Sequence, residues 1–305
     1  MSVIYQRVAL IGLGLIAGSM ALAMRRDGLA GEIVGTARSA ETRKIAAEIG
    51  LCDQIVDTVE EAVKDADLVV LAIPIGAMGE VAKQIEPHLK PGATVTDVGS
   101  VKQAVIAAIA PHIPKGVHFI PGHPMAGTEH SGPRSGFAEL FENRWCLLVP
   151  PVGAVADAVA KLQSLWLAMG ANVEQMDAEH HDLVCAVTSH APHLIAYTMV
   201  GVADDLSRVT DSEVVKFSAA GFRDFTRIAA SDPTMWRDVF LNNKAATLEI
   251  LGRFTEELFA LQRAIRTGDG DLLHDYFTHT RAIRRGIIDA GQDTEAPDFG
   301  RGAKR

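Results

Sequence analysis

The histidines of this chain are unevenly distributed, and two segments that contain them could transfer protons. Seven of the eleven histidines lie between positions 118 and 193. Imidazole is the side chain best suited to exchanging protons near neutral pH. One candidate is His123, which lies beside a proline in residues 121–132 (PGHPMAGTEHSG). The others are His190 and His193 in the sequence SHAPH, which share a face if this segment is helical.

Metal binding is the alternative use of these side chains, and the sequence does not favour it. The chain contains no HExxH sequence and no cysteine at metal-ligand spacing from the histidines. We therefore predict that the site holds no metal. Five further histidines are predicted to be surface or hydrogen-bonded structural residues: His118, His180, His181, His274 and His279.

A glycine-rich segment near the start of the chain could bind a pyrophosphate. Residues 12–18 read GLGLIAG and fit the pattern GxGxxG/A between an expected strand and an expected helix. In this pattern the first glycine allows a tight turn, the second admits the pyrophosphate, and the small third residue lets helix and sheet pack closely. The alternative is a turn that serves packing alone. The predicted dinucleotide contacts are Gly12, Gly14, Leu15, Ile16 and Ala17.

The end of the second expected strand bears on the choice of cofactor. It reads VGTARS, with no carboxylate at the position that would bind a ribose 2′-hydroxyl. Arg38 and Ser39 follow instead, and a guanidinium with a hydroxyl suits a 2′-phosphate. We therefore predict a preference for NADP over NAD. The alternative is that Arg38 is a solvated loop charge and that either cofactor is used.

Two further segments carry polar groups suited to a ligand. Ser100, in the sequence DVGSVK, follows an expected strand at the sheet edge where ligands bind, although a serine there could simply cap a helix. The sequence GFRDFTR places Arg223 and Arg227 four residues apart, with Asp224 able to orient Arg227. Arg227 could bind a substrate carboxylate. The alternative is a structural ion pair at a helix end.

Strands and helices that position these residues alternate over residues 1–177. Short β-branched or apolar runs predict strands, and periodic apolar positions between them predict helices. This alternation, together with the glycine loop, predicts a Rossmann-type, doubly wound, mostly parallel α/β sheet. The expected strands are residues 7–12, 32–36, 68–73, 94–97, 117–120, 145–149 and 172–176.

The pattern changes near Asp177. Strand signals are scarce in residues 178–290, where apolar residues recur at helical spacing, so this region is predicted to be an all-helical domain. Residues 291–305 contain little that could be buried, and we expect a mobile tail.

Composition limits the partners and the compartment. The 305 residues carry a net charge of −9, which is unfavourable for general nucleic-acid binding. Three widely spaced cysteines and no CxxC pair are typical of a reduced, cytoplasmic protein. Residues 8–24 are uncharged and could imitate a signal peptide, but their three glycines argue against one. We expect no membrane partner and no other stretch able to span a bilayer.

Taken together, the segments GLGLIAGSMA, DVGSVK, GHPMAGTEHSG, SHAPH and GFRDFTRIAASDPTMWRD resemble the prephenate/arogenate (cyclohexadienyl) dehydrogenase family of tyrosine biosynthesis. They occur in the same order over about residues 6 to 290. The resemblance implies an NAD(P)-dependent oxidoreductase with a Rossmann domain, a helical dimerisation domain, a small-molecule substrate and a homodimeric state. It also implies oxidative decarboxylation of prephenate, arogenate or both, to 4-hydroxyphenylpyruvate or tyrosine.

The resemblance also suggests roles for individual residues. His123 matches the family histidine that accepts the proton of the substrate's C4 hydroxyl, and Ser100 matches a serine that hydrogen-bonds the same hydroxyl near the nicotinamide. Arg227 matches the arginine that binds the ring carboxylate. His190 and His193 match paired histidines of the substrate site, and Glu129 matches an acid at the mouth of the cleft.

Two other functions remain open from the sequence. One is a different Rossmann-plus-helical dehydrogenase of the β-hydroxyacid type, which would rely on a lysine or aspartate of its helical domain. The other is a non-enzymatic NADP-binding sensor. Compared with some members of the family, we expect neither a chorismate mutase region before the Rossmann domain nor a regulatory domain after the helices.

Overall fold

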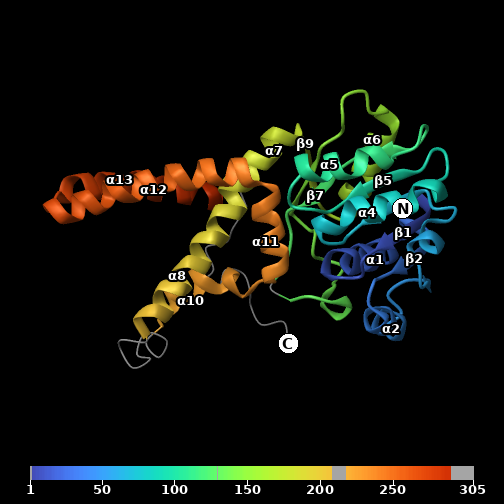
Figure 1. Ribbon diagram of the computed structural model, residues 1–305, viewed down its shortest axis with the longest axis horizontal. Helices are drawn as coiled ribbons and strands as arrows, with labels where there is room; N and C mark the ends of the chain where they lie inside the picture. Colours follow the sequence, from blue (N-terminus) through green and yellow to red (C-terminus); the bar gives the residue numbers. More distant parts are fainter. Residues whose placement is uncertain (1, 129, 208–217, 290–305) are drawn as a thin grey trace. The chain divides into compact units, whose positions relative to one another are not determined.

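The computed structural model describes residues 2–128, 130–207 and 218–289 (Figure 1). The chain divides into two compact units, Met1–Leu248 and Glu249–Arg305. The candidate site residues that the structure describes all belong to the first unit.

A six-stranded parallel sheet forms the centre of the first unit, as the sequence predicts. Its strand order is β3-β2-β1-β4-β5-β6, the doubly wound order of dinucleotide-binding folds. Because every pair is parallel, the carboxyl ends of all six strands meet at one edge. The strands are β1 (Tyr5–Ile11), β2 (Ala30–Thr36), β3 (Gln54–Ile55), β4 (Leu68–Leu71), β5 (Thr94–Asp97) and β6 (His118–Phe119).

Helices cover both faces of this sheet. In the central strand β1, Val8 and Leu10 pack into one apolar core, while Ala9 and Ile11 pack into the other. This explains why β1 is apolar at consecutive positions. The helices of this part are α1 (Leu15–Asp27), α2 (Ala40–Glu48), α3 (Val59–Val63), α4 (Ile75–Ile85), η1 (Glu86–His88), α5 (Gln103–Ile109), η2 (Ala110–His112), η3 (Pro133–Ser135) and α6 (Ala156–Ala168).

A second, three-stranded sheet departs from the single sheet that the sequence suggests. It contains β7 (Gly122–Pro124), β8 (Trp145–Leu148) and β9 (Asn172–Gln175), with β7 antiparallel to β8. Strand β7 has three residues, one of them a proline, and is therefore too short to give an alternating pattern. No strand is among those expected over these residues, whereas the structure gives His123 a strand position.

The helical part of the first unit begins with a continuous stretch formed by α7 (Ala178–Cys185), η4 (Ala186–His190) and α8 (Ala191–Ser207). The middle segment η4 is a π-helix. By length and composition alone, Ala178–Asp205 is a helix that could cross a membrane, so the expectation that no such stretch exists was wrong. The apolar runs in it look short because polar residues interrupt them. The later elements are α10 (Ala220–Thr226), η5 (Arg227–Ala230) and α11 (Pro233–Asn242).

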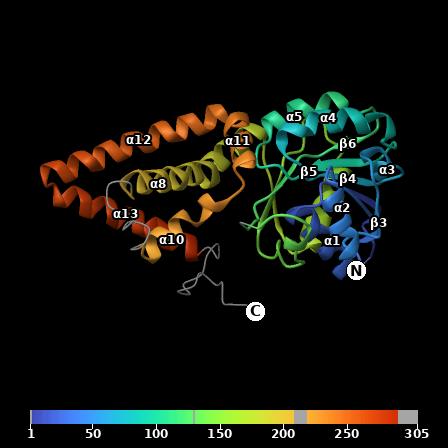
Figure 2. The same ribbon diagram turned by 60° about the horizontal axis from the view of Figure 1, so that its bottom comes forward.

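The helix α12 (Lys244–Thr267) crosses the division between the units. It is joined to α13 (Gly270–Asp289) by a two-residue connection that contains Gly268, whose φ is +71° (Figure 2). Glycine adopts this left-handed conformation without the steric cost that a side chain adds. The predicted tail, residues 291–305, lies outside the described residues.

Candidate active site

The glycine loop lies between β1 and α1, and a side chain would be excluded from its two glycine positions to different degrees. Gly12 has φ of +92°, and a Cβ there would lie 2.3 Å from the carbonyl oxygen of Ala72. Gly14 is the N-cap of α1, and a Cβ there would meet no atom within 4 Å. Gly12 is therefore required by the fold, whereas Gly14 leaves space beside the N-terminus of α1. Ala17 is fully buried between helix and sheet.

The residues after β2 are arranged around a helix start. Ser39 is the N-cap of α2, and its hydroxyl accepts a hydrogen bond from the backbone N–H of Thr42 at 3.4 Å. Arg43 donates to Asp57 at 3.1 Å and to the carbonyl oxygen of Ala37 at 2.6 Å, so it braces this turn. Arg38 is exposed. This exposed guanidinium therefore lies at the carboxyl edge of the sheet, next to the strand that carries the glycine loop.

The carboxyl end of β5 is organised around a buried ion pair. Lys102 and Asp97 are both fully buried and bonded to each other, and the Lys102 ammonium also donates to the carbonyl oxygen of Gly122 at 2.7 Å. Ser100 lies half-buried in the loop between them. The helix begins only at Gln103, with Lys102 as its N-cap, so the N-cap interpretation of Ser100 was wrong.

His123 is brought to this edge by β7, which begins where β6 has ended. The backbone N–H of Gly122 donates to Asp97 at 3.3 Å, which fixes the start of β7 beside β5. The His123 side chain is 8% exposed. Its Nδ1 lies 2.9 Å from Nε2 of His181.

His181 and Asp182 were not recognised from the sequence as site residues. His181 is fully buried, and its Nδ1 lies 2.9 Å from the Asp182 carboxylate. That carboxylate also accepts hydrogen bonds from the backbone N–H groups of Lys102 at 2.7 Å and Gln103 at 3.0 Å, so it caps α5. The only available signal was the adjacent His-Asp pair, which by itself is common on helix surfaces.

Burial determines the charge of this cluster. Burial, followed by the electrostatic influence of His181, Lys102 and His190, holds the pKa of His123 well below its usual value. Burial also lowers the pKa of His181, and the Asp182 carboxylate does not overcome this effect. Burial alone would raise the pKa of Asp182, but hydrogen bonds from His181, Gln103 and Lys102 lower it. The cluster at neutral pH is therefore two neutral imidazoles beside a carboxylate.

The predicted pair of histidines lies at the junction of η4 and α8. His190 is fully buried, and its Nδ1 accepts a hydrogen bond from the amide of Asn243 at 3.0 Å. The same amide donates to the carbonyl oxygen of Asp182 at 2.8 Å. Burial lowers the pKa of His190 to about 4. His193 donates from Nδ1 to the carbonyl oxygen of Ser189 at 2.8 Å.

The indole ring of Trp236 covers one face of the His193 imidazole. Their rings stack with centroids 3.7 Å apart, and Trp236 is 6% exposed, as expected for a packing role. Arg227, the first residue of η5, is half-buried. Burial lowers the pKa of His193, and the charge of Arg227 lowers it further, so these two side chains lie within electrostatic reach of each other. Asp224 is exposed, and Glu129 lies outside the described residues.

One set of side chains in the described residues could hold a metal ion. Ligand atoms of His123, His181 and Cys185 all lie within 4.8 Å of one another. The Cys185 sulfur is 3.6 Å from Nδ1 of His123 and 3.5 Å from Nε2 of His181. Burial raises the pKa of this thiol to about 12, so it is protonated at neutral pH. The prediction that the site holds no metal stays a prediction.

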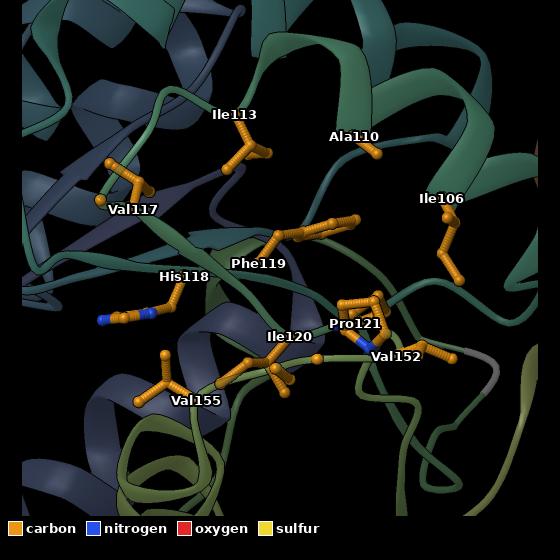
Figure 3. A pocket seen from close by; sticks show the side chains of 14 residues that line it. Ile106, Ala110, Ile113, Val117, His118, Phe119, Ile120, Pro121, Val152 and Val155 are labelled. Atoms are coloured by element: carbon orange, nitrogen blue, oxygen red, sulfur yellow. The ribbon is translucent and has the colours of Figure 1, made fainter.

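A separate cavity of about 420 Å³ lies beside the edge strand β6 (Figure 3). Its lining is mainly apolar, with Ile113 and Phe119 on one side and Val152 and Val155 on the other. It contains none of the predicted site residues. Because ligands of doubly wound sheets bind at the carboxyl edge, this cavity is not the expected cofactor site.

The sheet order, the glycine loop and the buried histidines at the carboxyl edge together define a Rossmann-fold oxidoreductase. Two family models match consecutive parts of the chain between residues 20 and 279. The prephenate dehydrogenase nucleotide-binding domain matches residues 20–175, and the prephenate dehydrogenase dimerization domain matches residues 177–279. The chain belongs to the prephenate dehydrogenase family.

Individual relatives agree with this assignment. The cyclohexadienyl dehydrogenase of Zymomonas mobilis is 38% identical over 281 residues, which are 92% of this chain and 96% of that protein. The prephenate dehydrogenase of Bacillus subtilis is 34% identical over 92% of this chain and 76% of its own length. A solved prephenate dehydrogenase from A. aeolicus, in complex with hydroxyphenyl propionate and NAD+, has a TM-score of 0.85, 34% identity, and coverage of 92% of this chain and 98% of that one.

Proposed function

We propose that the protein catalyses the NAD(P)-dependent oxidative decarboxylation of prephenate, arogenate or both. The observation that carries this proposal is a buried histidine, neutral at neutral pH, at the carboxyl edge of a dinucleotide-binding sheet. When bound, a nicotinamide cofactor would supply the acceptor for the hydride on C4 of the substrate ring. The C4 hydroxyl gives up its proton as the hydride leaves, the ring carboxylate departs as carbon dioxide, and its bonding electrons aromatise the ring. The proton then returns to the phenolate oxygen at C4, which gives 4-hydroxyphenylpyruvate from prephenate or tyrosine from arogenate.

His123 is the acceptor of the hydroxyl proton in this proposal. Only a neutral imidazole can accept a proton, and burial keeps His123 neutral. Ser100, in the loop that follows β5, hydrogen-bonds the same hydroxyl near the nicotinamide. Arg227 binds the ring carboxylate, while His190, His193 and Glu129 complete the substrate site.

The proposed cofactor is NADP, with NAD as the alternative. The glycine loop from Gly12 to Ala17 binds the pyrophosphate at the N-terminus of α1. Arg38, exposed after β2, binds the 2′-phosphate, and Ser39 adds a hydroxyl at the same turn. No carboxylate stands at the position directly after β2 that would bind a ribose 2′-hydroxyl.

We also propose that the protein is a homodimer. Large apolar side chains on α12 and α13 are exposed in the single chain, which is typical of a surface that a second subunit covers. Examples are Leu258, Phe259, Ile265, Phe277 and Ile283, each more than half exposed. Light scattering after gel filtration measures the mass in solution, and a monomeric mass at micromolar concentration would contradict this proposal.

The experiment that tests the activity is a spectrophotometric assay of cofactor reduction by the purified protein. Prephenate and arogenate are each offered with NADP and with NAD. Turnover with either substrate supports the proposal, and the ratios of kcat/KM give the preferences. No turnover in any mixture, with NADP still bound, would contradict it in favour of a sensor or a dehydrogenase of the β-hydroxyacid type.

A further inference from the structure

Asp182, His181 and His123 form a hydrogen-bonded chain, and the proposed chemistry uses only its last member, His123. Both links measure 2.9 Å, and the first and last residues are 59 positions apart in the chain. Each imidazole has two nitrogens, and only one carries a proton when the ring is neutral. The direction of the hydrogen bonds therefore decides which nitrogen of His123 is available as a base.

Two proton arrangements fit these distances. In both, Nδ1 of His181 donates to Asp182, because a carboxylate can only accept. If His181 is neutral, its Nε2 has a free electron pair and accepts a proton from Nδ1 of His123. If His181 is an imidazolium, its Nε2 donates to Nδ1 of His123, and the His123 proton then lies on Nε2. Only the first arrangement leaves Nε2 of His123 able to accept a proton.

The surroundings of His181 favour the neutral form. The ring is fully buried, and the positive charge of Lys102 disfavours an imidazolium there, against the attraction of the Asp182 carboxylate. The Asp182 carboxylate is also shared, because it accepts two backbone N–H groups at the N-terminus of α5. Because three donors already stabilise this carboxylate, it raises the pKa of the His181 ring less than a carboxylate without other partners would. Cys185 is a neutral thiol more than 3.4 Å from either nitrogen and does not compete strongly.

We propose that His181 and Asp182 are positioning residues that hold His123 in the tautomer with its proton on Nδ1 and a free electron pair on Nε2. This inference rests on the proposed function of His123 as the proton acceptor. When His123 accepts the hydroxyl proton at Nε2, the new positive charge is stabilised through Nδ1 by His181 and, behind it, by Asp182. No proton needs to leave His181 for this to happen.

The anchoring of Asp182 makes the arrangement rigid. Its two backbone donors belong to α5, which follows directly on the loop that contains Ser100, and its own carbonyl oxygen is held by Asn243. The Asp182 carboxylate thus links the N-terminus of α5 to His181 in α7. A catalytic imidazole whose second nitrogen is held in this way does not rotate away from its substrate.

The test combines tautomer measurement with two variants at one position. In protein labelled with nitrogen-15 in its histidine rings, NMR of the unliganded enzyme reports which nitrogen of His123 carries the proton; His123→Asn identifies its signals. His181→Gln keeps an oxygen that can accept from His123 and an amide that can donate to Asp182. His181→Leu has similar size and neither group.

The proposal expects a proton on Nδ1 of His123 in the wild type and in His181→Gln. It expects kcat in His181→Leu to fall on the order of 10²–10⁴-fold, from the loss typical of a residue that orients a ligand to that of the residue that fixes a triad histidine, while His181→Gln retains most of the activity. A His123 protonated on Nε2 in the folded wild type would overturn it. So would equal kcat values for the two variants, or a stoichiometric metal whose removal abolishes activity.

The outcomes separate this inference from the proposed function. If the wild type turns over neither prephenate nor arogenate, the function fails, even with the proton of His123 on Nδ1. If the wild type is active and His123 carries its proton on Nε2, the function stands and the positioning role fails. The measurement on the wild type does not depend on the folding of any variant.

Discussion

The ammonium of Lys102 and the carboxylate of Asp97 form a fully buried ion pair at the carboxyl end of β5. The pair does more than neutralise two charges. Lys102 donates to the carbonyl oxygen of Gly122, and Asp97 accepts from the backbone N–H of the same residue. The residue before His123 is therefore held from both sides, and the strand β7 takes its position from the sheet edge that carries the cofactor loop.

The first prediction concerns the proposed proton acceptor. His123→Asn removes the basic nitrogen and keeps a polar side chain of smaller size, so we expect kcat to fall by about 10²–10⁴-fold. Steady-state kinetics with prephenate or arogenate measure it, with circular dichroism to show that the variant is folded. A folded variant with normal kcat would remove His123 from the mechanism.

Arg227→Ala should act mainly on substrate binding. Charged hydrogen bonds to a carboxylate contribute about 1.5–3 kcal/mol, so we expect KM for the substrate to rise about 10- to 100-fold. The matched control is Arg223→Ala, because Arg223 is exposed and lies four residues earlier. Equal KM values for the two variants would show that Arg227 does not bind the substrate.

The two loop glycines should respond differently to alanine. Gly12→Ala combines a positive φ with a contact at 2.3 Å, and we expect a loss of about 3 kcal/mol in the free energy of unfolding. Gly14→Ala meets no protein atom within 4 Å, so it should cost about 1 kcal/mol or less while weakening cofactor binding. Thermal unfolding and cofactor titration separate the two effects, and unchanged cofactor affinity in Gly14→Ala would argue against a pyrophosphate there.

Arg38→Ala should change the cofactor preference. Loss of a guanidinium–phosphate contact should lower kcat/KM for NADP about tenfold or more and leave kcat/KM for NAD nearly unchanged. Lys44→Ala controls for the loss of a nearby surface charge, because the Lys44 side chain is 77% exposed in α2, the helix that follows Arg38. If both cofactors are affected equally, or if the wild type prefers NAD, Arg38 has no such role.

The buried histidines should make stability depend on pH. The pKa of His190 falls from 6.5 to about 4 on burial, so the unfolded chain binds more protons than the folded chain below pH 6.5. Stability from this residue is therefore complete above pH 6.5 and is lost as the pH falls toward 4. We expect Tm to fall over this range and to fall less steeply in His190→Gln. Parallel Tm profiles would contradict this assignment.

Local patterns predicted much of the molecule. The glycine loop and the parallel, doubly wound sheet follow from short stretches whose residue types are diagnostic, and the role of His123 stays a prediction. The partners of His123 could not be found in the same way, because His181 lies 58 residues away and pairs with it only through the packing of α7 on β7. Asn243 lies 53 residues from His190, and an isolated asparagine carries no signal. The second sheet was missed because β7 is so short.

The π-helix η4 decides which side of the helix His181 and His190 face relative to each other. An α-helix advances about 100° per residue, so nine residues would put His181 and His190 on opposite sides. The wide turn between them accommodates an extra residue and reduces that rotation, which lets both rings reach the same buried network through Asp182 and Asn243. Removal of the extra residue would let this segment close into a regular α-helix with both histidines still on the same side, whereas insertion of one residue would rotate one histidine out of the site.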